Sequence, residues 1–252
     1  MAKGTVNRRT VIGILLIFAF WIVIYYSGVV SPALLASPLA AIARVFTLLV
    51  SGDLIEDVQL TGYRWLVGYI GGIMLGIPVG LFMGTSRVFA QLMEFPVDFF
   101  RSLPVTSLFP LFLLAFGIGD ESKIAMVGVA VFFVLVINSA YGAAQGASKK
   151  RQMAKSFGAS DWQTFKDVTV WEAVPQIFVG MRIALSTSLI VVIVSEMFMG
   201  TQYGLGQRVF DAYSKNAVNE LYGVLIFTGI VGYLLNKLFV VIEKKVLFWV
   251  GN

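Results

Sequence analysis

Long apolar segments alternate with shorter polar ones along the whole of this 252-residue chain. A helix needs about 20 apolar residues to cross the hydrocarbon core of a bilayer, and segments of that length recur here. They predict six membrane-spanning helices with approximate bounds 10–28, 63–84, 97–117, 122–141, 180–200 and 221–242. The pattern therefore predicts an all-α integral membrane protein in which residues 1–252 form a single transmembrane domain.

The region around the first span has two further features. Three basic residues precede the span, and its apolar run from Val11 to Tyr26 is long for a cleaved signal peptide, so an uncleaved anchor is expected. After it, Ser37-Pro38 is a helix-start signal, and Pro38 to Val50 has the pattern of an amphipathic helix at the outer interface. That helix is either a rim that meets a partner or an interfacial linker.

Glycine recurs at every fourth position of the second span, which places these residues on one face of a helix. Such a small-residue ridge lets a neighbouring helix approach closely, so it predicts tight helix packing. Pro78 lies inside the same span and is expected to kink it. The ridge consists of Gly68, Gly72, Gly76, Gly80 and Gly84.

The third span is interrupted by Pro104 and Pro110. Each proline removes a backbone donor and frees a carbonyl group within the helix. Thr106 and Ser107 lie between the prolines and can hydrogen-bond such carbonyl groups. The third span is therefore expected to be a broken helix, a feature that often borders a water-filled cavity.

A few polar side chains lie within the spans and are candidates for a translocation path. Arg101 either lines a cavity beside the broken helix, or reaches the inner interface and pairs with Asp98 or Glu94. Glu196, near the outer end of the fifth span, either lines the path or anchors the outer loop. Neutral polar side chains either line the path or bond backbone carbonyl groups and pack against neighbours. These neutral candidates are Thr106, Ser107, Asn138, Ser186 and Ser188.

Composition excludes several classes of function. Only 13% of the residues are charged and 58% are hydrophobic, against about 25% charged in soluble domains. The chain has no cysteine and no histidine, which excludes Cys/His metal sites, thiol catalysis and imidazole bases. No P-loop motif occurs, so ATP is not expected to bind this chain through one, and no metal or other cofactor site is predicted.

The basic residues are distributed unevenly between the two sides of the predicted membrane. With the N-terminus inside, thirteen Lys and Arg residues fall on the inner side and five on the outer side. This bias predicts that both termini and the loop at about 142–179 are cytoplasmic. The net charge of +5 follows from this topology, so no nucleic-acid partner is needed to explain it.

The loop at 142–179 contains a compact polar motif. Gly158 separates a short helical run from Ser160-Asp161-Trp162-Gln163, which has the form of a capping box. The expected conformation is a helix, a glycine break and a second helix. Since the loop is also the most basic one, we interpret it as a surface presented to a soluble partner.

The loop resembles a signature of permease subunits of bacterial ABC importers. That signature begins with E-A-A, has a glycine after three further residues, and ends with I-x-L-P after nine more. Gln152-Met153-Ala154 stands at the E-A-A positions, although Gln152 replaces the acidic residue, and Trp171 replaces a proline. The branch that moves nitrate, sulfonates, taurine or bicarbonate is more similar still. The residues that match its pattern are Ser156, Phe157, Gly158, Ala159, Ser160, Trp162, Phe165, Val168, Ala173, Pro175, Ile177, Gly180 and Arg182.

The resemblance extends over most of the chain, including Gly76-Ile-Pro-Val-Gly80, Arg101 to Pro110, Phe116 to Lys123, Ser195-Glu196-Met197 and Gly204-Leu-Gly206. It implies a type I ABC importer permease fold and a homodimer in a bacterial inner membrane. The homodimer would move a small solute, and the solutes named for the more similar branch suggest an anion such as nitrate, bicarbonate, a sulfonate or taurine. The resemblance also implies a separate ATPase subunit, carrying ATP and Mg, and an extracytoplasmic substrate-binding protein. The alternatives are a secondary carrier or channel, and a non-transporting scaffold for an ATPase.

Overall fold

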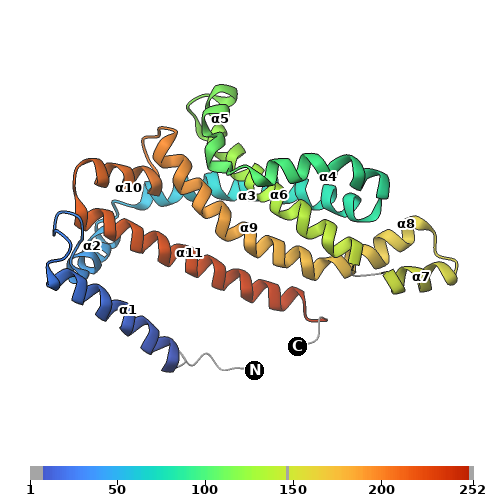
Figure 1. Ribbon diagram of the computed structural model, residues 1–252, viewed down its shortest axis with the longest axis horizontal. Coiled ribbons are helices and arrows are strands. Elements are labelled where there is room, and N and C mark those ends of the chain that lie inside the picture. The colour runs from blue at the N-terminus through green and yellow to red at the C-terminus, as the bar shows by residue number, and fades with distance from the viewer. Residues whose placement is uncertain (1–7, 146–147, 250–252) are drawn as a thin grey trace.

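The computed structural model describes residues 8–145 and 148–249, and within these residues every regular element is a helix (Figure 1). Lys3, Gly146 and Ala147, which contribute to the predicted charge bias and loop, lie outside the described residues. The predicted all-α membrane fold is confirmed, but in the described residues four helices, or five if a bent pair counts as one span, are long and apolar enough to cross a membrane, against the six predicted. Four long apolar helices form the bundle: α3 (Ile55–Thr85), α6 (Asp120–Gln145), α9 (Val170–Phe198) and α11 (Val218–Val246).

Helices α3 and α6 pack with their backbones in close approach along the glycine ridge. A β-carbon at Gly72 would lie 2.5 Å from the Val131 β-carbon, and one at Gly80 would lie 2.4 Å from the Val136 carbonyl oxygen. All five ridge glycines face α6 in this way. The absence of side chains on this face lets the two helices touch over most of their length, as small-residue ridges do in membranes.

The first predicted span corresponds to α1 (Arg8–Ser27), which has few contacts with the bundle. Its apolar stretch, Val11–Ser27, is shorter than those of the four long helices. The indole of Trp21 holds its end in place by donating to the Ala36 carbonyl oxygen at 3.1 Å and stacking on Tyr222. Most other large side chains of α1 are exposed, as expected for a helix whose surroundings are lipid.

The predicted interfacial helix is present as α2 (Pro38–Ser51), which packs against α11. Ser37 is its N-cap, accepting a hydrogen bond from the Ala40 backbone N–H at 3.1 Å, and Pro38 occupies the first turn. The helix-start prediction is therefore confirmed. Figure 1 shows α2 near α10 (Leu205–Ser214), at the end of the bundle opposite the predicted loop.

The third predicted span is not a straight helix beginning at 97. Helix α4 (Arg87–Ser102) includes that region, and a 3-10 turn η1 (Val105–Leu108) and helix α5 (Phe109–Phe116) follow it. The two halves are bent by 87°. The bend occurs at Leu103-Pro104, where both residues are extended, because proline disfavours helical geometry in the residue before it. Helix α5 consequently points away from the bundle (Figure 1).

Candidate functional site

The loop predicted at 142–179 is named the coupling loop here, because the resemblance implies that the ATPase docks on it. It is shorter in the structure, where residues 142–145 belong to α6 and residues 170–179 belong to α9, and it contains two short helices joined by a tight turn. Helix α7 (Ser148–Ser156) ends at Gly158, whose φ is +86°. The Ala159 N–H donates to the Ala154 carbonyl oxygen at 3.0 Å and the Gly158 N–H donates to the Lys155 carbonyl oxygen at 3.0 Å. These two bonds form a Schellman motif, which favours glycine at the left-handed position. The predicted glycine break is confirmed.

The second helix of the loop begins with the predicted capping box. The Ser160 hydroxyl accepts from the Gln163 N–H at 3.2 Å, and the Gln163 side chain accepts from the Ser160 N–H at 2.8 Å. Helix α8 (Asp161–Gln163) then continues through a π-helical segment, η2 (Thr164–Thr169), into α9. Pro175 lies half-buried inside α9. The loop therefore has a defined conformation that is connected directly to a membrane-spanning helix.

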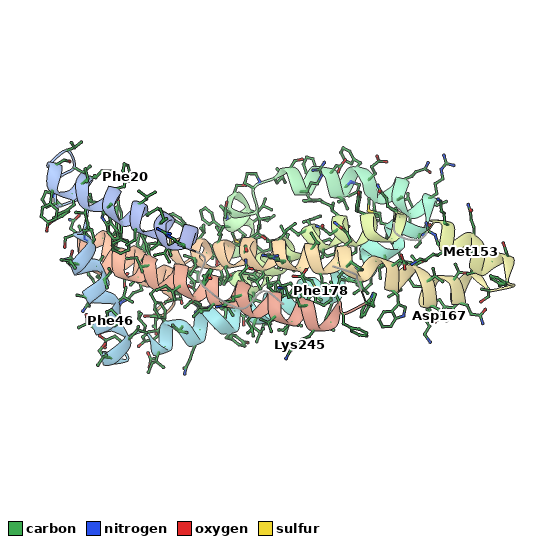
Figure 2. The ribbon with its side chains drawn as sticks, turned by 90° about the horizontal axis from the view of Figure 1, so that it is seen from below. Phe20, Phe46, Met153, Asp167, Phe178 and Lys245 are labelled. Atoms are coloured by element: carbon green, nitrogen blue, oxygen red, sulfur yellow. The ribbon has the colours of Figure 1, made fainter. Side chains whose placement is uncertain are left out.

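Three large apolar side chains of the loop are exposed. The exposed fraction is 60% for Met153, 87% for Phe157 and 66% for Trp162. Figure 2 shows Met153 at the end of the molecule opposite Phe20 and Phe46. Gln152 and Ser160 are exposed beside these apolar side chains, and Ala154 and Ala159 are half-buried. An exposed apolar patch of this kind, outside the spanning helices, marks an interaction surface.

An aromatic stack connects the loop to α3. Trp162 stacks on Phe165 with ring centroids 5.8 Å apart, and Phe165 stacks on Phe82 of α3 at 5.9 Å. Contacts of this geometry stabilise by about 0.5–1.5 kcal/mol beyond the area they bury. The stacked rings thus form a continuous contact from the exposed Trp162 to the membrane-spanning α3.

The candidate path residues lie in separate parts of the structure. Arg101 is half-exposed and its Nε donates to Asp98 at 2.8 Å, which is the pair considered above. Ser107 is exposed and donates to the Pro104 carbonyl oxygen at 2.7 Å, and Thr106 is half-buried in the same turn. These three residues share the broken segment between α4 and α5.

The remaining neutral candidates lie away from that segment. Asn138 accepts from the Gln176 side chain at 3.1 Å and so joins α6 to α9. Ser188 is fully buried and accepts from the Trp65 indole at 2.9 Å. Ser186 is exposed and borders an apolar cavity of about 800 Å³ between α3, α9 and α11. Asn138 and Ser188 thus make packing contacts between helices in this structure.

Glu196 lies in a buried ionic cluster at the end of the bundle opposite the loop. Its exposed fraction is 0%, and its carboxylate accepts from the Arg64 guanidinium at 2.7 Å and from the Thr61 hydroxyl at 2.9 Å. Arg64, exposed by only 2%, also donates to Asp120 at 2.7 Å. This arrangement favours the second of the two roles considered for Glu196, that of anchoring the outer loop.

The same cluster holds the beginning of α10. The N–H groups of Gly204, Leu205 and Gly206 donate to Asp57, Thr61 and Glu196 respectively, at 2.8, 2.9 and 2.9 Å. These three donors belong to the first turn of a helix and have no partners within it. Arg64 also donates to Thr201 and to the Tyr203 carbonyl oxygen, both at 2.9 Å. Helices α3, α6, α9 and α10 are thereby fixed to one another.

Sequence reasoning alone misses Arg64, Thr61 and Asp57 as members of one cluster. The sequence does contain a signal for them. Positions 57, 61 and 64 are three or four residues apart and lie on the same face of the helix as the glycine ridge, nearer the start of α3. One face of that helix therefore carries polar residues first and then the ridge glycines, and these residues are buried from Asp57 to Gly80. Among the described residues, no group of three or more carboxylates is arranged to hold a metal ion.

Comparisons with known proteins agree with this geometry. Residues 72–247 match the family described as the binding-protein-dependent transport system inner membrane component. A Bacillus subtilis (strain 168) protein named as the aliphatic sulfonates transport permease SsuC is 30% identical over 92% of this chain and 84% of its own. A Synechocystis nitrate import permease protein, NrtB, is 29% identical over 73% of this chain and 66% of its own.

A solved structure supports the same fold. An inward-facing form of the MetNI methionine ABC transporter matches with a TM-score of 0.68 over 77% of this chain and 95% of the matched chain. The sequence identity of that match is 21%, so it bears on the fold alone. Helical architecture, the exposed two-helix loop and the family match together lead to one assignment. The chain belongs to the family of binding-protein-dependent transport system inner membrane components and is a permease subunit of an ABC importer.

Proposed function

We propose that two copies of this chain form the translocation path of an ATP-driven importer in a bacterial inner membrane, with both termini in the cytoplasm. A separate ATPase subunit binds ATP and Mg and docks on the coupling loop. The observation that carries this proposal is the exposure of Met153, Phe157 and Trp162 on a loop whose conformation is defined by the Gly158 turn and the capping box. Large apolar side chains that are exposed to water commonly mark a surface that binds another protein.

The second copy is proposed from the exposed face of the broken segment. Helix α5 projects from the bundle, and the apolar side chains on it and just after it are therefore uncovered (Figure 1). The exposed fraction is 53–86% for Leu111, Leu114, Phe116 and Ile118. Packing of this apolar face against a second copy would enclose the break between α4 and α5. Arg101, Thr106 and Ser107 would then lie close to the boundary between the two copies, where a solute could pass.

The proposed solute is a small anion such as a sulfonate or nitrate. The support comes from the names of the relatives and from Arg101, whose guanidinium lies beside the break in a half-exposed pair with Asp98. An extracytoplasmic binding protein would deliver this solute to the opposite end of the bundle, near α2 and α10. Positive potential in a partly dehydrated path attracts anions more strongly than in bulk water.

Transport by reconstituted vesicles tests the proposed function. We expect uptake of nitrate or an alkanesulfonate only when the permease, the ATPase subunit, the binding protein and ATP are all present. Uptake without the ATPase would show a secondary carrier or channel. Binding of the ATPase with no uptake of any tested anion, in a fully assembled complex, would show a scaffold instead.

Substitution of Gly158 tests the coupling loop. A β-carbon at Gly158 meets no atom within 4 Å, so Gly158→Val changes only the backbone preference at φ +86°. The left-handed conformation costs a residue with a β-carbon about 1–2 kcal/mol. We expect Gly158→Val to insert normally but to lower the anion transported per ATP hydrolysed severalfold. Gly158→Asn, which tolerates this conformation, should retain most coupling; equal coupling in all three proteins would contradict the assigned role.

Substitution of Arg101 tests the path. If Arg101 attracts the solute, Arg101→Gln should lower anion uptake severalfold while assembly and basal ATP hydrolysis stay unchanged. If Arg101 serves only its pair with Asp98, then Arg101→Gln and Asp98→Asn should lower expression or thermal stability to similar small extents. Uptake, assembly and thermal stability are therefore measured on both variants. Normal values throughout would remove Arg101 from both roles.

A further inference from the structure

A polar cavity of about 500 Å³ lies between the coupling loop and the end of α3. Its lining includes Thr85 of α3, Arg151, Gln152 and Lys155 of α7, and Thr164 of η2. The cavity is separate from the exposed patch of Met153, Phe157 and Trp162, none of which borders it. Docking of a protein on that patch therefore does not explain why charged and polar side chains line this cavity.

Thr164 supplies an unsatisfied polar group to the cavity. The residue is exposed by only 3%, and its hydroxyl has no hydrogen-bond partner among residues 8–145 and 148–249. Buried polar groups without a partner are uncommon and cost about 1–3 kcal/mol. Thr164 also borders a second cavity of about 420 Å³, whose only charged side chain is Asp167. Of the two cavities that Thr164 borders, only the first is lined by cationic side chains, and an anion is therefore expected in that one.

The charges around the first cavity favour an anion. Arg151 and Lys155 contribute two positive charges and Asp161 contributes one negative charge, so the lining carries a net charge of +1. Arg151 donates to the Ala143 and Ala144 carbonyl oxygens at the end of α6, at 2.7 and 3.1 Å, which fixes its guanidinium in place. Lys155 pairs with Asp161 at 2.7 Å and keeps further ammonium protons for a ligand.

We propose that this cavity binds a soluble oxyanion of the phosphate, sulfate or sulfonate class. Lys155 and Arg151 supply charge, and the Thr164 hydroxyl and the Gln152 amide supply neutral donors to the oxygen atoms. Rotation of the Thr164 side chain would bring its buried hydroxyl to the cavity, where a bound oxyanion would accept the hydrogen bond that it otherwise lacks. The bound oxyanion would also link α7 and η2 to the end of α3, and so restrain the loop relative to the bundle.

The position of the cavity favours a soluble anion over a lipid headgroup. Basic pockets between membrane helices at the cytoplasmic surface commonly bind headgroups. Here, however, Lys245 near the end of α11 lies part way along the molecule, whereas Met153 and Asp167 of the loop lie well beyond it (Figure 2). The cavity belongs to this projecting region, where water-soluble anions are the available ligands.

The experiment is a titration of the purified full-length chain in neutral detergent with inorganic phosphate or sulfate. Chloride at matched ionic strength serves as the control salt. The binding is followed by calorimetry and by the midpoint of thermal unfolding. We expect saturable binding of phosphate or sulfate that raises the midpoint, and no such effect of chloride. Because the ATPase is absent, this result does not depend on the proposed function.

Variants assign the binding to the cavity. Lys155→Met should weaken binding about tenfold and Thr164→Val about threefold to fivefold, from the usual strengths of charged and neutral hydrogen bonds. Asp161→Asn should strengthen binding, because it removes the carboxylate that competes for Lys155. Lys149→Met, an exposed charge change on the same helix outside the cavity, should have little effect. Thr164→Val should fold normally, since the Thr164 hydroxyl bonds to none of the residues that the structure describes.

Three outcomes would overturn the proposal. The first is no saturable effect of either oxyanion on the wild-type chain. The second is equal binding by the wild-type chain, Lys155→Met and Thr164→Val, which would place the anion elsewhere. The third is stabilisation by phosphatidylglycerol but not by free phosphate or sulfate, when nanodiscs of phosphatidylcholine with and without phosphatidylglycerol are compared. That third result would identify a lipid headgroup as the ligand in place of a soluble anion.

Discussion

Replacing Glu196 by alanine is expected to destabilise the protein by about 3–5 kcal/mol, because it leaves the buried Arg64 guanidinium with Asp120 as its remaining counter-charge and leaves the buried Thr61 hydroxyl without its acceptor. The substitution also removes the acceptor for the Gly206 N–H in the first turn of α10. We expect a large fall in thermal stability and loosening of the 199–204 segment. Thermal unfolding and limited proteolysis of the purified complex measure these two effects.

A paired variant separates the charge from the packing. Arg64→Met combined with Glu196→Leu removes both charges and fills similar volume, so it should be considerably more stable than Glu196→Ala alone. Glu196→Gln keeps the hydrogen-bonding shape and should fall between them. If Glu196→Ala were as stable as the wild-type protein, the ionic cluster would have no anchoring role.

The second large effect is expected in the glycine ridge. A β-carbon at Gly72 would lie 2.5 Å from the Val131 β-carbon and 2.7 Å from the Gly128 carbonyl oxygen. Gly72→Leu should therefore force α3 and α6 apart, at a cost of about 1–3 kcal/mol or more from overpacking. We expect a reduced yield of assembled protein and a lower midpoint of thermal unfolding.

The adjacent glycine provides a matched control. A β-carbon at Gly71 meets no atom within 4 Å, although Gly71 lies on the same helix at nearly the same depth. Gly71→Ala should be neutral or stabilising by up to about 1 kcal/mol, because alanine favours helix more than glycine does. Gly72→Ala should be destabilising. The same sign for both alanine variants would show that close packing does not govern this face.

Local patterns in the sequence predicted much of the fold. Apolar length located the long helices, Ser37-Pro38 located the start of α2, and Ser160 with Gln163 located the capping box. Each of these features depends on residues within a few positions of one another, so spacing alone is informative. The position of Gly158 in a left-handed turn belongs to the same class.

Features that depend on distant residues could not be predicted in this way. Arg64 meets Asp120 and Glu196, which belong to other helices, and no local pattern pairs them. Ser188 suits a water-lined path by its chemistry, but the Trp65 indole from α3 occupies its hydroxyl. The direction of α5 was equally inaccessible, because the prolines fix where the helix breaks and tertiary packing decides where it turns.

The glycine ridge also affects the synthesis of this chain. Helix α3 ends at Thr85 and its packing partner α6 begins only at Asp120, so a ribosome producing roughly 5–20 residues per second completes α3 several seconds before α6 is available. During that interval the glycine face of α3 lacks the helix that packs against it in the folded protein. The nascent chain thus carries a span with an uncovered packing face, and a chain terminated between α5 and α6 should be a preferred substrate for membrane quality-control proteases.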